Sequence, residues 1–170
     1  IAPNQMIDTT ATLVGKDGVI AQTTAADSTT AASGNAPFDS FSGVINEGGT
    51  AIASVSQLQF SIANSLAPTF TVGNETTTQL EFGRAVVEGT LTAYFEDETL
   101  ISKFIDETES DIEVELSDPN SANTYTFLFP RVKYNGGDVP VQDPQSRLIS
   151  LPFVALYDTT EDTNLKLTIA

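Results

Sequence analysis

Strict alternation of polar and apolar residues constrains the fold of this chain more than any other feature. In Gln57–Ile62 the apolar residues Leu58, Phe60 and Ile62 alternate with polar ones, and Val87–Phe95 repeats the pattern over a longer run. Successive side chains of a β-strand point to opposite faces, so each run predicts a strand with one buried and one wet face. Further strands are expected at Thr69–Val72, Asp111–Leu116, Tyr125–Tyr134, Arg147–Tyr157 and Leu165–Ile169.

The period changes between Glu96 and Glu107, where apolar residues recur at helical spacing. Asp97 is suited to cap a helix N-terminus, and Glu98 would place a negative charge in its first turn. This predicts one helix of roughly three turns. About six or seven strands with a single helix predict a mainly β fold, an antiparallel β-sandwich or barrel with one flanking α-helix. Pro130 and Pro152 lack a backbone N–H, so each is expected at an edge, a bulge or the mouth of a barrel.

Residues 1–53 differ in texture from the rest and are rich in Thr, Ala, Ser and Gly. Few large apolar side chains are available in Gln22–Asn35 to offset the entropy of ordering. We therefore expect an N-terminal arm or loop region over residues 1–53 and a β-sandwich domain over residues 54–170. Apolar residues late in the arm suggest that it docks on its own domain or on a neighbour. A start at Ile1, without Met or a signal sequence, is compatible with a processed or partial chain.

Composition excludes several classes of function. The chain of 170 residues has no His, Cys or Trp, which removes the Ser-His-Asp triad, the thiolate nucleophile, the usual zinc site and any disulfide. No enzymatic activity and no cofactor are expected. The 23 Asp and Glu against 7 Lys and Arg give a net charge of −16, which opposes binding to nucleic acid phosphates. Apolar stretches fall far short of the ~20 residues that cross a bilayer, so no membrane span is expected.

Three segments carry a resemblance to a known family. They are the run Glu88-Gly89-Thr90-Leu91-Thr92-Ala93-Tyr94-Phe95-Glu96-Asp97 before the predicted helix, the strand Leu128-Phe129-Pro130-Arg131-Val132-Lys133-Tyr134, and the segment Pro152-Phe153-Val154-Ala155-Leu156-Tyr157-Asp158. In this order, the region from Ser54 to Ala170 resembles the tail tube proteins of tailed bacteriophages. None of the segments is a catalytic fingerprint.

The resemblance implies a structural subunit of the virion tail, assembled in the host cytoplasm. Such subunits form six-fold rings, or three-fold rings where one chain carries two tube domains, and strands of several subunits build a barrel around the lumen. The implied partners are further copies of the chain in stacked rings and other tail proteins. DNA would pass through the lumen without specific binding, and no membrane would be involved.

The charge balance gives the resemblance a physical interpretation. A lumen lined with Lys or Arg would hold DNA through counterion release, whereas carboxylates repel it. The expected lumen-facing residues lie on polar strand faces: Gln57, Gln59, Glu88, Thr90 and Thr92. Subunit contacts are expected at apolar residues of the arm and in the loops Phe70–Gln79 and Asn135–Gln145. The residues named for these contacts are Phe38, Phe41, Val44, Ile45 and Phe70.

The acidic residues also allow other interpretations. One cluster of acidic residues could be interpreted as paired catalytic carboxylates: Glu109, Asp111, Glu113 and Glu115. A solvated strand face is the better interpretation, because alternation alone explains their spacing. Asp158, Glu161, Asp162 and Asn164 could ligate Ca²⁺, but a polar loop is the simpler account since the D-x-D-x-D-G pattern is missing. The scarcity of Lys is also compatible with a salt-rich habitat.

The alternative function is a secreted or cell-surface β-sandwich, such as an adhesin or a pilin-like subunit whose arm completes a neighbour's sheet. A carbohydrate-binding module is disfavoured because the chain has no Trp and only 4 Tyr to form an aromatic platform.

Overall fold

The computed structural model describes residues 1–15, 37–40, 43–52, 54–95, 98–118, 123–140 and 147–170. The chain divides into two compact units. The sandwich unit contains Ile1–Asp8, Ala36–Ile62 and Val86–Ala170, and the hairpin unit contains Thr9–Asn35 and Ala63–Ala85.

The sandwich unit is built on one antiparallel sheet of 8 strands in the order β2-β1-β7-β8-β9-β6-β3, with β10 paired to β8. Its elements are β1 (Gly43–Glu47), β2 (Thr50–Ala51), β3 (Val55–Ala63), β6 (Val86–Tyr94), α1 (Thr99–Ile105), β7 (Ser110–Ser117), β8 (Thr124–Tyr134), β9 (Leu148–Ala155) and β10 (Lys166–Ile169). The predicted mainly β fold with one flanking helix is confirmed.

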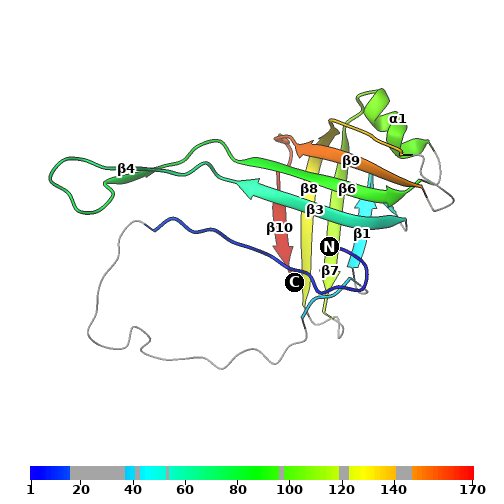
Figure 1. The fold of residues 1–170 in the computed structure, drawn as a ribbon, viewed down its shortest axis with the longest axis horizontal. Coiled ribbons are helices and arrows are strands. Elements are labelled where there is room, and N and C mark those ends of the chain that lie inside the picture. Colours follow the sequence, from blue (N-terminus) through cyan, green and yellow to red (C-terminus); the bar gives the residue numbers. More distant parts are fainter. Residues whose placement is uncertain (16–36, 41–42, 53, 96–97, 119–122, 141–146) are drawn as a thin grey trace. The chain divides into compact units, whose positions relative to one another are not determined.

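Strand β8 joins the two layers of the sandwich. One of its edges pairs with β7 from Thr124 to Val132, whereas the other pairs with β10 from Tyr125 to Leu128 and then with β9 from Val132 to Tyr134. Ser110 of β7 pairs with Val132 of β8, whereas Ile112 pairs with Phe129, so the register shifts between these two pairs. The irregularity in β8 therefore lies between Phe129 and Val132, and this interval contains Pro130. The position of Pro130 at a bulge is therefore confirmed. Figure 1 shows β3, β6 and β9 running steeply across β7, β8 and β10, an arrangement typical of orthogonally packed sheets.

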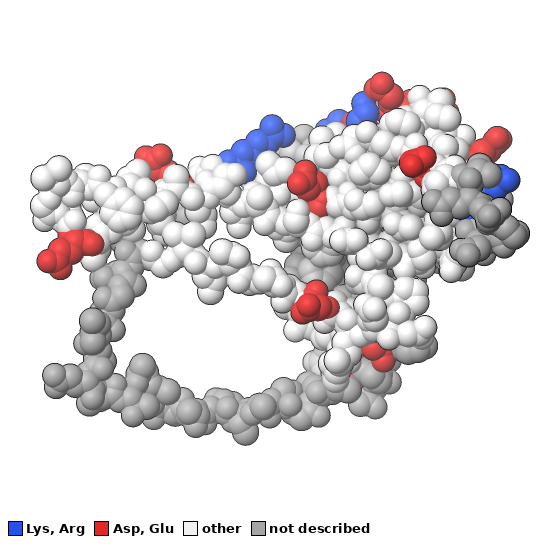
Figure 2. All heavy atoms as spheres, in the orientation of Figure 1, with Lys and Arg blue, Asp and Glu red and all other residues white. Residues whose placement is uncertain are grey.

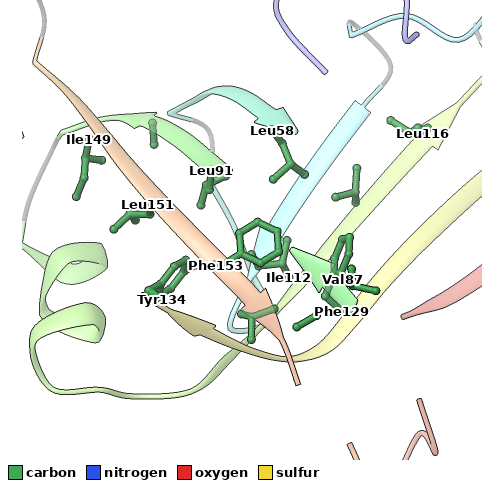
Figure 3. Close-up of a cluster of buried hydrophobic side chains, with 14 residues drawn as sticks. Leu58, Val87, Leu91, Ile112, Leu116, Phe129, Tyr134, Ile149, Leu151 and Phe153 are labelled. Atoms are coloured by element: carbon green, nitrogen blue, oxygen red, sulfur yellow. The ribbon is translucent and has the colours of Figure 1, made fainter. Parts of the chain in front are cut away.

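The buried side chains come from the apolar positions of the alternating strands (Figure 3). Leu91 of β6, Ile112 of β7 and Leu151 of β9 are each 0% exposed. Rings of the two layers meet across the core: Phe60 of β3 lies 5.1 Å from Phe129 of β8, centroid to centroid. The ring of Phe129 also lies 5.7 Å from the ring of Phe153 in β9, so Phe129 contacts aromatic rings of both β3 and β9. The core thus fixes which face of each strand is turned outward.

Helix α1 has 7 residues, so the expectation of roughly three turns was wrong. Its N-cap is Glu98, which makes no side-chain capping bond, and Asp97, the expected cap, lies outside the described residues. The helix ends where Glu107 adopts a positive φ of 54°. Its N–H then bonds to the carbonyl of Phe104 and that of Thr108 to the carbonyl of Lys103, the pattern of a Schellman motif. No helix in the described part of the chain has the length and apolar character to cross a membrane.

Strands β1 and β2 were not predicted, because they fall in the segment assigned to the arm. They form a hairpin in which Glu47 opposes Thr50, so that Gly48 and Gly49 make the whole turn. Both glycines have positive φ, 61° and 71°, as a type I′ turn requires. The other edge of β1 pairs with β7 from Gly43 to Glu47. This part of the N-terminal segment is therefore an integral part of the sheet.

In the hairpin unit, β4 (Ala67–Thr69) pairs with β5 (Gln79–Glu81) and with no other described strand. The buried hydroxyl of Thr77 supports the tip by donating to the carbonyl of Thr69 over 2.8 Å. An isolated two-stranded hairpin is at best marginally stable in water. The β4–β5 hairpin therefore needs stabilising contacts from outside its own two strands.

Candidate functional site

The polar residues predicted to face a lumen share one surface of the sandwich unit. Gln57 and Gln59 alternate with buried Leu58 in β3, and Glu88, Thr90 and Thr92 alternate with buried residues of β6. Because β6 lies between β3 and β9 in the sheet, all five side chains stand on the outer surface of three adjacent strands. We call this surface the β3–β6–β9 face. Pairing with β9 adds Ser150 opposite Thr92 and Pro152 opposite Thr90.

The β3–β6–β9 face is nearly free of charge. Glu88 is the sole charged residue in the sequences of β3, β6 and β9, all of which the structure describes. The polar groups that the face presents are amides, hydroxyls and one exposed carboxylate per chain, beside the apolar side chains of Pro152 and Val154. With no Lys or Arg on it, the surface lacks the groups that displace counterions from nucleic acid.

Three cations of β8 and β10, namely Arg131, Lys133 and Lys166, are engaged by carboxylates of the same chain. Arg131 of β8 makes a bidentate contact with Glu109, 2.6 Å from Nε and 2.8 Å from Nη2. Lys133 lies 2.7 Å from Glu107, and Lys166 of β10 lies 2.6 Å from Glu161. The hydrogen bonds from Arg131 and Lys133 hold the pKa values of Glu109 and Glu107 below the ordinary value for a glutamate. Figure 2 shows most acidic groups standing apart from one another, with Lys and Arg side chains along the upper and right-hand margins of the view.

A buried ion pair, which the sequence did not indicate, ties α1 to the sheet. Lys103 Nζ lies 2.6 Å and 2.5 Å from the two carboxylate oxygens of Glu47, whose side chain is 5% exposed. The hydroxyl of Tyr134 donates to the same carboxylate over 3.3 Å, and Lys103 also donates to Ser110. Burial, followed by the charge of Glu47 and this hydrogen bond, raises the pKa of Tyr134 far above its ordinary value. The cluster is fully hydrogen-bonded and has a structural role.

The carboxylates weighed as Ca²⁺ ligands are occupied within their loop. Asp158 accepts the N–H groups of Thr160 and Glu161 at 2.8 Å and 2.9 Å, and these bonds lower the pKa of Asp158. Asp162 accepts a hydrogen bond from the hydroxyl of Tyr157. Among the residues that the structure describes, no His, Cys, Asp and Glu side chains gather as a metal site would require.

The residues expected at subunit contacts lie in different environments. Phe38 packs edge to face on the ring of Tyr125 at 5.0 Å, and Ile45 packs against the core. Val44 is 46% exposed and Phe70 is 71% exposed. Phe41 lies outside the described residues.

The hairpin unit exposes Val72, which lies in the predicted contact loop Phe70–Gln79, and Phe82, which the sequence did not lead us to expect at a contact. Val72 is fully exposed and Phe82 is 83% exposed. The signal was present, because Leu80 and Phe82 alternate with polar residues as in a strand. This alternating segment is too short to be identified as a strand when it is compared with the longer alternating segments of the chain.

Comparisons with solved structures agree with the fold. The fold is similar to a chain from an extracellular contractile injection system, the PVC sheath/tube terminator in its extended state, with TM-score 0.61, 11% identity, and 81% of this chain and 99% of that chain covered. A chain from the virion of a native gene transfer agent particle gives TM-score 0.53 at 12% identity, covering 76% and 98%. A chain from the baseplate of the anti-feeding prophage, 6-fold symmetrised, gives TM-score 0.50 at 12% identity, covering 84% and 97%.

No curated protein matches the sequence significantly. The sequence model of the phage tail tube protein family matches residues 1–155, including the N-terminal segment that the resemblance over Ser54–Ala170 left out. The chain belongs to the phage tail tube protein family, a family of structural components of phage tails.

Proposed function

We propose that this chain is the subunit of stacked rings that form a tail tube, with the β3–β6–β9 face turned to the lumen. The family is structural, so no catalytic role is assigned to any residue. The tube would be part of the virion tail, assembled in the host cytoplasm from further copies of the chain and other tail proteins. In this role it conducts the viral genome into the host.

The distribution of charge over the two sheet layers carries the proposal. Transit of a polyanion needs a wall that does not bind it, and affinity for DNA rises with each phosphate that a cation neutralises. The β3–β6–β9 face carries Glu88 and no cation, whereas β8 and β10 carry Arg131, Lys133 and Lys166. Turning the former face inward gives a hydrated, weakly acidic bore, and Arg131, Lys133 and Lys166 are each paired with a carboxylate of the same chain.

An open strand edge offers a route to ring closure. Strand β3 ends the sheet order, so one of its edges has no strand partner in the described part of the chain, although Leu58 of β3 exchanges two backbone hydrogen bonds with Ile1. Such an edge is a template for pairing with another chain. A head-to-tail contact that closes by rotation would continue the barrel from one subunit to the next. The 6-fold symmetrised baseplate that contains a chain of similar fold is consistent with six subunits per ring.

Negative-stain microscopy of the purified protein over a range of concentrations tests the assembly. We expect annular end views and hollow side views. Solid unbranched fibres would instead favour the pilin-like alternative, and monomers at every concentration would contradict ring formation. A tube map in which Lys or Arg side chains stud the channel would overturn the assignment of the lumen face.

A further inference from the structure

The dipeptide Asn135-Gly136 lies where the chain leaves β8 and its regular pairing with β9 ends. The N–H of Asn135 donates to the carbonyl of Pro152 over 3.0 Å. Asp138 then exchanges two backbone hydrogen bonds with Ser150, at 3.2 Å and 3.1 Å. Three residue steps on this side oppose two on β9, so one residue is extra, as in a β-bulge. Within the described part of the chain, the N–H of Gly136 accordingly donates no hydrogen bond.

Packing requires a glycine after Asn135. A Cβ atom at Gly136 would lie 2.8 Å from Cγ of Pro152, which is closer than real contacts. The missing side chain lets the bulge pass close to β9. It also leaves the backbone nitrogen that follows Asn135 without the steric shielding that a neighbouring Cβ provides. The fold therefore places a free and unshielded N–H directly after an asparagine.

The side-chain amide of Asn135 is also free to react. The residue is exposed, and its amide makes no hydrogen bond within the described part of the chain. By contrast, the amide of Asn46 donates to Glu113 and that of Asn74 donates to Thr71. Asn135 is also the one asparagine of the sequence that precedes glycine. Its environment and its neighbour thus set it apart from the other asparagines.

We propose that Asn135 is a site of spontaneous deamidation through a cyclic imide formed with Gly136. The backbone nitrogen of Gly136 attacks Cγ of Asn135, the Cγ–Nδ2 bond breaks, and Nδ2 leaves as ammonia with the proton of the attacking nitrogen. Water then opens the ring and returns a proton to that nitrogen. Addition of water at Cγ gives aspartate, whereas addition at the backbone carbonyl carbon gives isoaspartate. Water is the one co-reactant, and no oxidation or reduction takes place.

The reaction changes the charge of the β3–β6–β9 face. Asn135 and Glu88 line the same hollow, which has a volume of about 360 Å³. Glu88 is the sole charged residue of the three strands, so each deamidation adds a second carboxylate beside it. Lys133, which lines a second hollow with Asn135, is already paired with Glu107 over 2.7 Å. The inference goes beyond the proposed function, because the reaction needs the fold of one chain alone.

Peptide mapping by mass spectrometry of protein aged at neutral pH tests the proposal. Asn135 begins the loop Asn135–Gln145, in which a subunit contact is predicted, so the protein is kept too dilute to assemble. We expect Asn135 to acquire the mass of the acid, with isoaspartate more abundant than aspartate on labelling with isoaspartyl methyltransferase. Asn64, which is exposed and precedes Ser65, is the internal control and should keep its amide. Equal conversion of both asparagines, or aspartate without isoaspartate, would contradict the cyclic route.

Isoelectric focusing of the folded protein gives a second readout. The wild type should accumulate a more acidic band that migrates with Asn135→Asp, whereas Asn135→Gln should remain a single band because its longer side chain would have to form a larger ring. An acidic band of equal intensity in Asn135→Gln would assign the charge change to another residue.

A denatured sample separates the effect of sequence from that of the fold. If Asn135 deamidates in the denatured chain but not in the folded protein, the bulge holds the two groups apart and the inference is overturned. None of these measurements depends on ring formation, so failure of the inference leaves the proposed function intact.

Discussion

Glu47 is the residue on which the attachment of α1 to the sheet depends. Its carboxylate accepts hydrogen bonds from Lys103 of the helix and from Tyr134 of β8, while its backbone belongs to β1. Buried ion pairs contribute little net stability compared with an apolar pair, but removal of one partner leaves an uncompensated charge. The cluster therefore makes the position of α1 sensitive to a single side chain.

The Glu47→Ala variant should lower the free energy of unfolding by about 3–5 kcal/mol, because Lys103 and the Tyr134 hydroxyl lose their common partner. Urea denaturation followed by circular dichroism measures the change. Glu107→Gln, which removes an exposed partner of Lys133, should leave the midpoint close to that of the wild type. Equal loss in both variants would show that burial of the Glu47 pair is not decisive.

Tyr134 should make the fold sensitive to alkaline pH. Burial raises the pKa of its phenol above the ordinary 10.0 that applies in the unfolded chain. The stability contribution of the protonated phenol is therefore complete below pH 10.0 and is lost as the pH rises above it. Tyrosinate absorbance should show one ionisation that coincides with unfolding, and Tyr134→Phe should remove that step. Ionisation of Tyr134 in the folded protein near pH 10 would contradict the prediction.

At the scale of elements, close packing of β3, β6 and β9 depends on the absence of a side chain at Gly89. A Cβ atom at this position of β6 would lie 2.5 Å from the carbonyl oxygen of Gln59 and 2.6 Å from the ring of Phe153. Both distances are shorter than real contacts, so either β3 or the Phe153 ring would have to move. Gly89 therefore determines how closely β3 and the Phe153 ring of β9 can approach β6 in the proposed lumen layer.

Gly89→Ala should therefore cost about 1–3 kcal/mol of stability, the usual penalty for overpacking a core. Thermal unfolding is the measurement. Gly49→Asn serves as the control, since Gly49 has nothing within 4 Å and Asn tolerates its positive φ. A Gly89→Ala protein as stable as the control variant would mean that β3 separates from β6 without cost.

The long strands could be predicted from sequence because each has a buried face that enforces alternation. The same alternation grouped Gln57, Gln59, Glu88, Thr90 and Thr92 on one surface, although it could not say that β9 completes that surface. Strands β1 and β2 escaped prediction because they are short and follow a Thr/Ala-rich tract. The buried pair could not be predicted, because Glu47 and Lys103 are 56 positions apart and only the fold joins them.

For the whole molecule, the net charge of −16 governs association. Screening shortens the range of repulsion between copies, with a Debye length of ~30 Å at 0.01 M salt and ~10 Å at 0.1 M. Contacts through apolar surfaces are not weakened by the same salt. We therefore expect tube formation to increase between 0.01 M and 0.1 M salt, as measured by sedimentation. Assembly that decreases with salt would indicate that ion pairs between subunits dominate.

The lumen assignment leads to a prediction about the virion. Glu88→Lys replaces the one charge on the β3–β6–β9 face with a cation that can displace counterions from DNA. Tubes should still assemble, because Glu88 is exposed, but DNA ejection should slow, and the defect should fade as salt rises. Thr168→Lys, an exposed change on β10 in the other layer, is the matched control and should eject at the wild-type rate. If Thr168→Lys slows ejection and Glu88→Lys does not, the layer of β7, β8 and β10 lines the bore instead.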